Sequence, residues 1–262
     1  MQIITSKDNE TVKAIKKLKE KKYRNESGKF IVEGIKMLEE ALQEKASIEK
    51  IILCEDCQND YSHELDVYEI AKNEIITVSE KIFKELTGVE NPQGILAVIN
   101  KEKNKPINYN EDIIIALDGI QDPGNLGTIL RTIDSVGLTQ VVLSEKTADP
   151  YNPKVVRSTM GAIYRVNIIQ TNNLQNTLKQ ITKNDYKIMA TALDEESKSV
   201  YDIKLKKKVI VIGNEANGIS KEIISMSDEK IIIPMLGKTE SLNAAVATGV
   251  ILYEYVRRKL QK

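Results

Sequence analysis

Residues 113–132 read IIIALDGIQDPGNLGTILRT, and this stretch decides the fold class. The run at 113–117 is entirely apolar and rich in isoleucine, which predicts a short buried strand. A loop of Gly, Pro and Asn residues follows Asp118, and a helix is predicted to start near Asn125. A buried strand that leads directly into a loop and a helix is typical of an α/β protein with a parallel sheet.

The same alternation continues to the end of the chain. Helical stretches separate most of the short apolar runs, which predicts a parallel sheet covered by helices on both faces. A last helix is predicted at 241–260, and its first half is apolar almost all round, which favours a second covering surface such as a dimer partner. The predicted strands of this part are 113–117, 141–143, 166–169, 188–192, 209–212 and 231–233.

A second, smaller α/β segment precedes this one. The polar stretch KEKNKPINYNED at 101–112 is interpreted as a linker. We therefore predict an N-terminal domain at 1–102, a linker at 103–110 and a C-terminal domain at 111–262. In the N-terminal domain the patterns predict helices at 8–22, 37–42 and 65–71, and strands at 30–32, 51–53, 75–78 and 95–99.

Composition excludes several classes of protein. The 262 residues include 38 basic and 38 acidic side chains, so a nucleic-acid partner has to be held by a local basic patch. No apolar run approaches the ~20 residues of a membrane span, and the N-terminus MQIITSKDNE has no signal-peptide pattern. Two cysteines and a single histidine, His63, nearly exclude disulfide frameworks, His-based triads and multi-His metal sites. We expect a cytoplasmic protein without a metal.

Polar loops follow three of the predicted strands, and ligands of open α/β sheets bind at such strand ends. In the first loop, Asn125 is placed to cap the helix, and Arg131 lies one turn beyond Gly127. A guanidinium in the first turns of a helix can clamp a phosphate. A capping residue, a turn glycine and a solvated arginine explain the same pattern without a ligand.

The second loop, GNEANG at 213–218, is not a dinucleotide fingerprint, because Glu215 stands where a glycine is needed. Glu215 could orient a cation or accept a hydrogen bond, and an exposed Glu on a glycine turn is the alternative. The third loop enters the last helix at Ser241-Leu242-Asn243, where free backbone N–H groups favour polar or anionic ligand atoms. Ser241 as a plain N-cap is the alternative, and for this loop taken by itself it is the preferred interpretation. The three loops together favour a site more than each does alone.

The remaining candidates are a cysteine pair and a basic patch. Cys54 and Cys57 form a CxxC, but neither a second pair nor a thioredoxin-like context accompanies them, so we interpret the pair as incidental. The densest group of cations lies at 13–24, where six lysines and one arginine occur. A solvated helix face and a footprint for a phosphate backbone are both compatible with this patch.

Taken together, the three loops resemble the three ordered motifs of the SpoU (TrmH) family of RNA ribose 2′-O-methyltransferases, within the α/β-knot superfamily. The matching residues are Asn125-x-Gly127-x3-Arg131-Thr132, Gly213-x-Glu215-x2-Gly218, and Ile233-Pro234 followed by Ser241-Leu242-Asn243. The stretch VRSTMGA at 156–162 resembles the helix between the first two motifs. GKFIVEG at 28–34 and NPQGI at 91–95 resemble the family's substrate-binding domain, which is similar to small RNA-binding ribosomal proteins. The resemblance covers essentially the whole chain.

The resemblance implies a deep trefoil knot in the C-terminal domain, which is an exception to the rule that chains do not thread loops. It also implies S-adenosylmethionine as the methyl donor, no metal, RNA as the substrate and a homodimer through the last helix. Cofactor contacts are implied for Gly213, Gly218, Ile233 and Leu242. The candidate RNA-binding residues are Lys17, Lys21, Arg24, Lys29 and Arg157.

The resemblance further implies a catalytic set of Asn125, Arg131, Glu215, Ser241 and Asn243. A guanidinium is hard to deprotonate, so we interpret Arg131 as a clamp on the adjacent phosphate and a stabiliser of the forming alkoxide. Glu215 is then expected to hold Arg131, while Ser241 and Asn243 position the ribose.

The two-domain layout is more similar to the family members that act on ribosomal RNA than to the shorter members that act on tRNA. We therefore expect large-subunit (23S) ribosomal RNA as the substrate, with tRNA as the alternative. A non-catalytic RNA-binding protein that keeps the fold is the other alternative. A nucleotide-dependent oxidoreductase would need a glycine fingerprint after the first strand, which DGIQDPGN at 118–125 does not supply.

Overall fold

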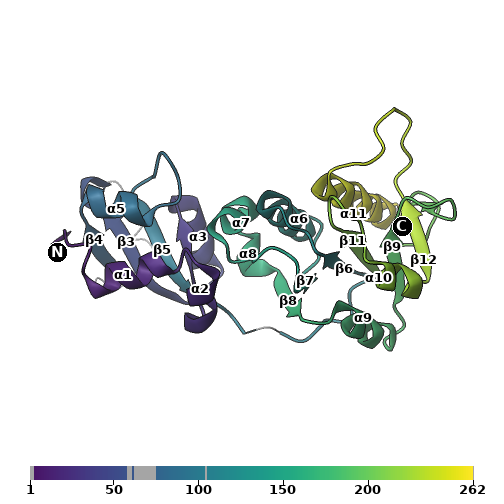
Figure 1. The fold of residues 1–262 in the computed structure, drawn as a ribbon, viewed down its shortest axis with the longest axis horizontal. Helices are drawn as coiled ribbons and strands as arrows, with labels where there is room; N and C mark the ends of the chain where they lie inside the picture. Colours follow the sequence, from purple (N-terminus) through teal and green to yellow (C-terminus); the bar gives the residue numbers. More distant parts are fainter. Residues whose placement is uncertain (1–2, 58–60, 62–74, 104, 262) are drawn as a thin grey trace. The chain divides into compact units, whose positions relative to one another are not determined.

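The computed structural model describes residues 3–57, 61, 75–103 and 105–261. Contacts between Cα atoms divide the chain into two compact units (Figure 1). The N-terminal unit comprises Met1–Lys103 and Tyr151–Tyr164, and the C-terminal unit comprises Asn104–Pro150 and Arg165–Lys262. The predicted boundaries at 102 and 111 stay a prediction.

The N-terminal unit contains a five-stranded mixed sheet of order β1-β4-β3-β5-β2, in which β5 is antiparallel to both of its neighbours. All four predicted strands of this part lie within observed strands, whereas the two-residue β1 was not predicted. The predicted helix at 65–71 and His63 lie outside the described residues. The strands are β1 (Ile3–Ile4), β2 (Lys29–Glu33), β3 (Ile48–Cys54), β4 (Ile75–Val78) and β5 (Ile95–Asn100), and the helices are α1 (Glu10–Lys17), α2 (Lys21–Ser27), α3 (Ile35–Gln43), η1 (Glu55–Cys57), α5 (Glu80–Leu86), α7 (Pro153–Thr159) and α8 (Ala162–Arg165).

The prediction of one helix at 8–22 is wrong, because the chain forms α1 and α2 with a break between them. Arg24 explains the break: its guanidinium donates hydrogen bonds to the carbonyls of Leu18 (2.8 Å) and Lys19 (2.7 Å). Those carbonyls lie at the end of α1, where helical partners run out. The Arg24 side chain is 2% exposed, so it is a buried part of this corner.

Residues 151–164 pack within the N-terminal unit, although the sequence places them in the C-terminal domain. The ring of Tyr151 contacts that of Phe30 at a centroid distance of 5.0 Å, and the Lys101 ammonium lies 4.4 Å from the Tyr151 ring centroid. The Tyr164 hydroxyl donates to the carbonyl of Met37 at 3.2 Å. Helix α7 therefore belongs to this unit by its contacts, with Arg157 on it.

The C-terminal unit contains a seven-stranded sheet of order β10-β12-β9-β11-β6-β7-β8, and every pair of neighbours is parallel. The predicted parallel sheet is thereby confirmed, while the short polar strand β10 was not predicted. The knot that the resemblance implies stays a prediction. The strands are β6 (Ile113–Asp118), β7 (Gln140–Ser144), β8 (Asn167–Thr171), β9 (Lys187–Thr191), β10 (Lys198–Ser199), β11 (Lys208–Gly213) and β12 (Glu229–Ile232), and the helices are α6 (Pro123–Ser135), α9 (Leu174–Thr182), α10 (Lys221–Met226) and α11 (Ala244–Leu260).

Helices cover both faces of this sheet (Figure 1). On one face, apolar side chains of β6 and β11 pack with those of α9 and α10 in a single buried cluster. Helix α11 packs against α6 and β11. Within the described part of the chain, no helix is long and apolar enough to cross a membrane.

Candidate active site

The first and second polar loops meet because β6 and β11 are neighbours in the sheet. Their last residues, Asp118 and Gly213, are paired in register. The Asn214 amide donates to the carbonyl of Gly119 at 2.7 Å, and the Ser220 N–H donates to the Asp118 carboxylate at 2.9 Å. The two loops thus form one rigid surface at the carboxyl edge of the sheet, where ligands of such sheets bind.

Loop 213–218 is a tight turn that depends on glycine. The backbones of Asn214 and Gly218 exchange two hydrogen bonds of 2.9 Å, and Gly218 has a φ of +66°. A Cβ on Gly213 would lie 2.3 Å from the carbonyl carbon of Gly218 and 2.4 Å from the nitrogen of Ile219. No side chain can occupy position 213 unless the backbone moves, so the loop approaches its own strand as closely as glycine permits.

The two helices that enter the site are capped by other residues than predicted. Asp122 caps α6 by accepting a hydrogen bond of 2.7 Å from the N–H of Asn125. Asn243 caps α11, because its side-chain oxygen accepts from Ala245 and Val246 at 2.9 and 3.3 Å. The predicted capping roles of Asn125 and Ser241 are therefore wrong, and the predicted start of the last helix is three residues early. Capping by Asp122 leaves the side chain of Asn125 available for other contacts.

Three of the predicted catalytic side chains form a chain of hydrogen bonds that connects the three loops. Asn243 donates from Nδ2 to Oδ1 of Asn125 at 2.9 Å, and Asn125 donates from Nδ2 to Oε1 of Glu215 at 2.8 Å. The partners are 118 and 90 residues apart in the sequence. Each bond orients the next side chain, so Glu215 indirectly fixes Asn243 at the start of α11.

A cavity of about 690 Å³ lies beside these three hydrogen-bonded side chains. Its volume is within the range of small-molecule sites. It is lined by Glu215, Ser241 and Asn243 of the predicted catalytic set. All four predicted cofactor-binding residues, Gly213, Gly218, Ile233 and Leu242, also line it.

Asn125 and Arg131 do not line the cavity. Arg131 is exposed on α6, and its guanidinium makes no hydrogen bond or ion pair with any residue for which the structure gives a position. The ion pair that we expected between Glu215 and Arg131 is not formed, because the Glu215 carboxylate accepts from Asn125 instead. Arg131 is thus free to meet a ligand from outside the cavity.

One wall of the cavity was missed by the sequence analysis. It comprises Thr191 at the end of β9, Ala192, Leu193 and Asp194 after β9, and Val200 after β10. The rule that ligands bind beyond strand ends applies to β9 as it does to β6 and β11. The segment contains no glycine and no motif, so only its place after a predicted strand could have indicated it.

The candidate RNA-binding residues differ in their availability. Lys17 and Lys21 are exposed, and the Lys17 ammonium lies 5.3 Å from the centroid of the Tyr23 ring. Lys29 forms an ion pair of 2.5 Å with Glu49, and Arg157 is half-buried. Arg24 is buried and holds backbone carbonyls, so its prediction as an RNA contact is wrong.

Among the residues with described positions, no group of three or more His, Cys, Asp or Glu side chains is arranged to hold a metal ion. Cys54 and Cys57 form no disulfide. Both side chains lie close to Gly94, where an added Cβ would be 2.4 Å from the Cys57 sulfur and 3.4 Å from Cβ of Cys54.

A parallel sheet whose strand ends carry interlinked polar loops beside a cavity defines an α/β enzyme that binds a small molecule at the edge of its sheet. Comparison with known proteins shows the family to which the chain belongs. Residues 112–253 match the model of the SpoU rRNA methylase family, and residues 9–97 match that of the MRM3-like substrate binding domain. The chain belongs to the SpoU rRNA methylase family, which confirms the resemblance.

Full-length relatives support this assignment. The chain is 31% identical to the 23S rRNA (guanosine(2553)-2′-O)-methyltransferase RlmP of Bacillus subtilis, over 97% of this chain and 98% of that protein. The crystal structure of an AdoMet-bound rRNA methyltransferase from Sinorhizobium meliloti superposes with a TM-score of 0.84, at 30% identity and 98% coverage of both chains. The SpoU methyltransferase AviRb from Streptomyces viridochromogenes, in complex with AdoMet, has a TM-score of 0.85 at 25% identity, covering 96% of this chain and 98% of that one.

Proposed function

We propose that the protein transfers a methyl group from S-adenosylmethionine to a ribose 2′-hydroxyl of 23S ribosomal RNA. The observation that carries the proposal is the hydrogen-bonded chain Asn243–Asn125–Glu215, which joins the three motif loops beside the cavity. RlmP, which aligns with 97% of this chain, is named for this reaction on 23S rRNA. The expected cytoplasmic location stays a prediction.

The cavity has the volume of a small-molecule site, and two of its lining residues are glycines that present only backbone groups to it. A Cβ on Gly213 would collide with the backbone of Gly218 and Ile219. We assign Gly213, Gly218, Ile233 and Leu242 as the residues that hold S-adenosylmethionine. When bound, this cofactor supplies a methyl group on a positively charged sulfur.

The acceptor side of the reaction is assigned to the polar residues at the cavity edge. Ser241 and Asn243 orient the ribose, and Glu215 holds Asn243 in place through Asn125. The task is mainly one of alignment, because oxygen, carbon and sulfur have to lie in line. Arg131 binds the phosphate next to the ribose and stabilises the negative charge that develops on the 2′-oxygen. The proton of the 2′-hydroxyl passes to solvent water, and the new bond from oxygen to the methyl carbon replaces the bond from that carbon to sulfur.

The proposal is tested by incubating the protein with labelled S-adenosylmethionine and either unmodified 23S rRNA or tRNA, followed by alkaline hydrolysis. A 2′-O-methyl group blocks cleavage at one linkage, so we expect label in an alkali-resistant dinucleotide from 23S rRNA. Label in tRNA and not in 23S rRNA would show that tRNA is the substrate. Binding of S-adenosylmethionine without transfer to either RNA or to ribosomal particles would favour the non-catalytic RNA-binding alternative.

Lys17 and Lys21 are proposed as phosphate contacts of the N-terminal unit. Both are exposed at the junction of α1 and α2, whereas Lys16 and Lys19 of the same patch bind Glu85 and nearby carbonyls. Replacing both by alanine should weaken RNA binding. It should also reduce the magnitude of the slope of log association constant against log salt concentration by about 1.4, because two contacts with a single strand are lost. Fluorescence anisotropy over a salt series measures this slope. Lys36→Ala on α3 is the control, and an equal change in that variant would contradict the assignment.

A homodimer through α11 is proposed from the side chains that this helix leaves uncovered. Val246, Tyr253 and Leu260 are 52%, 55% and 80% exposed and recur every seventh residue, so they form one apolar stripe. Exposed apolar stripes of this kind mark contact surfaces. Sedimentation should give a dimer for the wild type and a monomer for Tyr253→Lys. A wild-type monomer at micromolar concentration would contradict the proposal.

A further inference from the structure

The cavity wall missed by the sequence analysis, residues 191–200, runs from the last residue of β9 through β10 and is tied to β12 near both of its ends. The N–H of Ala192 donates to the carbonyl of Ile231 at 3.1 Å, and the N–H of Val200 donates to that of Ile232 at 2.9 Å. Between these ties, the Ser197 hydroxyl donates back to the carbonyl of Ala192 at 2.8 Å. The ends of the wall are therefore fixed by β12, while its middle needs other contacts.

Lys230 of β12 holds the middle of the cavity wall. Its ammonium lies 2.7 Å from the carboxylate of Asp194 and 3.3 Å from that of Glu196. Asp194 lines the cavity, whereas Lys230 does not. One ammonium thus connects two carboxylates of the wall and draws them onto β12 from outside the cavity.

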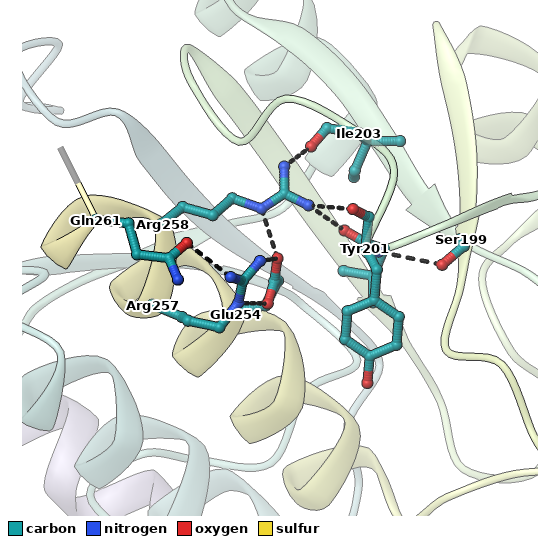
Figure 2. A network of polar contacts seen from close by, with 8 residues as sticks. Ser199, Tyr201, Ile203, Glu254, Arg257, Arg258 and Gln261 are labelled. Atoms are coloured by element: carbon teal, nitrogen blue, oxygen red, sulfur yellow. Dashed lines mark hydrogen bonds and ion pairs between the residues drawn. The ribbon is translucent and has the colours of Figure 1, made fainter.

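Arg258, in the last turn of α11, holds the far end of the wall (Figure 2). Its guanidinium donates to the carbonyls of Val200 (3.2 Å), Tyr201 (2.6 Å) and Ile203. Val200 lines the cavity and is fully buried, so Arg258 contacts the cavity wall through the backbone of a lining residue.

Glu254 orients this guanidinium from one turn earlier on α11. Its carboxylate accepts from Arg258 at 2.5 Å and from Arg257 at 2.7 and 2.8 Å, and its side chain is 4% exposed. Hydrogen bonds from Arg257, and to a smaller extent from Arg258, lower the pKa of the Glu254 carboxyl to about 2 against the opposing effect of burial. Ile251, three residues before Glu254, lines the cavity. Figure 2 shows that the network joins α11 to the segment that follows β10.

We infer that Lys230 and Arg258 are positioning residues that hold the wall 191–200 in the shape that binds the methyl donor. The inference rests on the proposed function, because it takes S-adenosylmethionine as the occupant of the cavity. A wall that is already ordered loses little conformational freedom on binding, and this raises the affinity. When the side chain of Lys230 or Arg258 is removed, the wall has to become ordered at the moment of binding, so the affinity for S-adenosylmethionine falls.

The inference is tested by measuring the dissociation constant of S-adenosylmethionine by calorimetry for Lys230→Met and Arg258→Met. We expect an increase of up to about fivefold for Lys230→Met, because its ion pairs are partly exposed. For Arg258→Met we expect about tenfold or more, because three backbone carbonyls lose a charged donor. Lys230→Arg and Arg258→Lys should restore part of the affinity, and RNA affinity should not change.

Arg165→Met is the matched control. Arg165 forms a two-pronged ion pair with Asp134 at 3.0–3.1 Å in the same unit, and neither residue lines the cavity. This variant should lower the melting temperature without changing the cofactor affinity. Lys230→Met removes only surface contacts, so it remains informative if Arg258→Met does not fold.

Amide hydrogen exchange provides a second measurement. The protection of the Ala192 and Val200 amides should fall in Lys230→Met and Arg258→Met but not in Arg165→Met. Wild-type affinity in Lys230→Met together with unchanged exchange would overturn the inference. A wild-type protein that binds no S-adenosylmethionine would overturn the proposed site as well.

Discussion

Replacing Arg131 by alanine should reduce the rate of methyl transfer by about a thousandfold and leave the affinity for S-adenosylmethionine nearly unchanged. We expect the rate to fall without a change in cofactor affinity because of where this side chain lies. Arg131 is exposed on α6, does not line the cavity and forms no ion pair within the described chain, so its guanidinium is available to the RNA alone. Single-turnover transfer and calorimetric titration of the cofactor measure the two quantities separately.

Two further variants sharpen this prediction. Arg131→Lys keeps the charge but loses the planar fork that binds a phosphate through two hydrogen bonds, so we expect only partial activity. Lys183→Ala removes an exposed cation at the end of α9 in the same unit and should transfer normally. Equal losses of cofactor affinity and transfer in Arg131→Ala would show that the residue shapes the cavity, in contradiction to the proposed role.

The second large effect is expected for Gly213→Ala, a change of one methyl group. Its Cβ would lie 2.3 Å from the Gly218 backbone, so the backbone of Gly218 and Ile219 has to move away from the end of β11. A displacement of about 1 Å in a site costs about a hundredfold in rate. Because Gly213 lines the cavity, we expect weaker cofactor binding as well as slower transfer, unlike the pattern for Arg131.

Gly237→Ala is the control for this variant, since an added Cβ there meets no atom within 4 Å. It should bind S-adenosylmethionine as the wild type does. Circular dichroism has to show that Gly213→Ala keeps its secondary structure. A folded Gly213→Ala protein with wild-type cofactor affinity would exclude this loop from the binding site.

Local patterns predicted the elements of the C-terminal unit well, because a buried strand is an uninterrupted apolar run. The run at 113–117 became the first five residues of β6, and 209–212 lies within β11. The patterns failed where a side chain from outside an element ends that element. The predicted helix at 8–22 is divided by the guanidinium of Arg24, which no periodicity reveals.

The same limit applies to the site. Asn125 and Ser241 had the right composition for N-caps, but Asp122 and Asn243 hold those positions, since capping depends on the backbone angles at each helix start. The wall at 191–200 has no sequence motif. The two side chains that hold it, Lys230 and Arg258, come from β12 and from the end of α11.

The sequence by itself determined the apolar strands of both units, the three motif loops and the membership of a methyltransferase family, because each is a property of neighbouring residues. Only the tertiary structure decided that Glu215 holds Asn125 and that Asn125 holds Asn243. Those contacts join residues 90 and 118 positions apart. They exist because β6 and β11 lie side by side in the sheet and α11 packs against both α6 and β11, an arrangement that follows from burying all the apolar faces together.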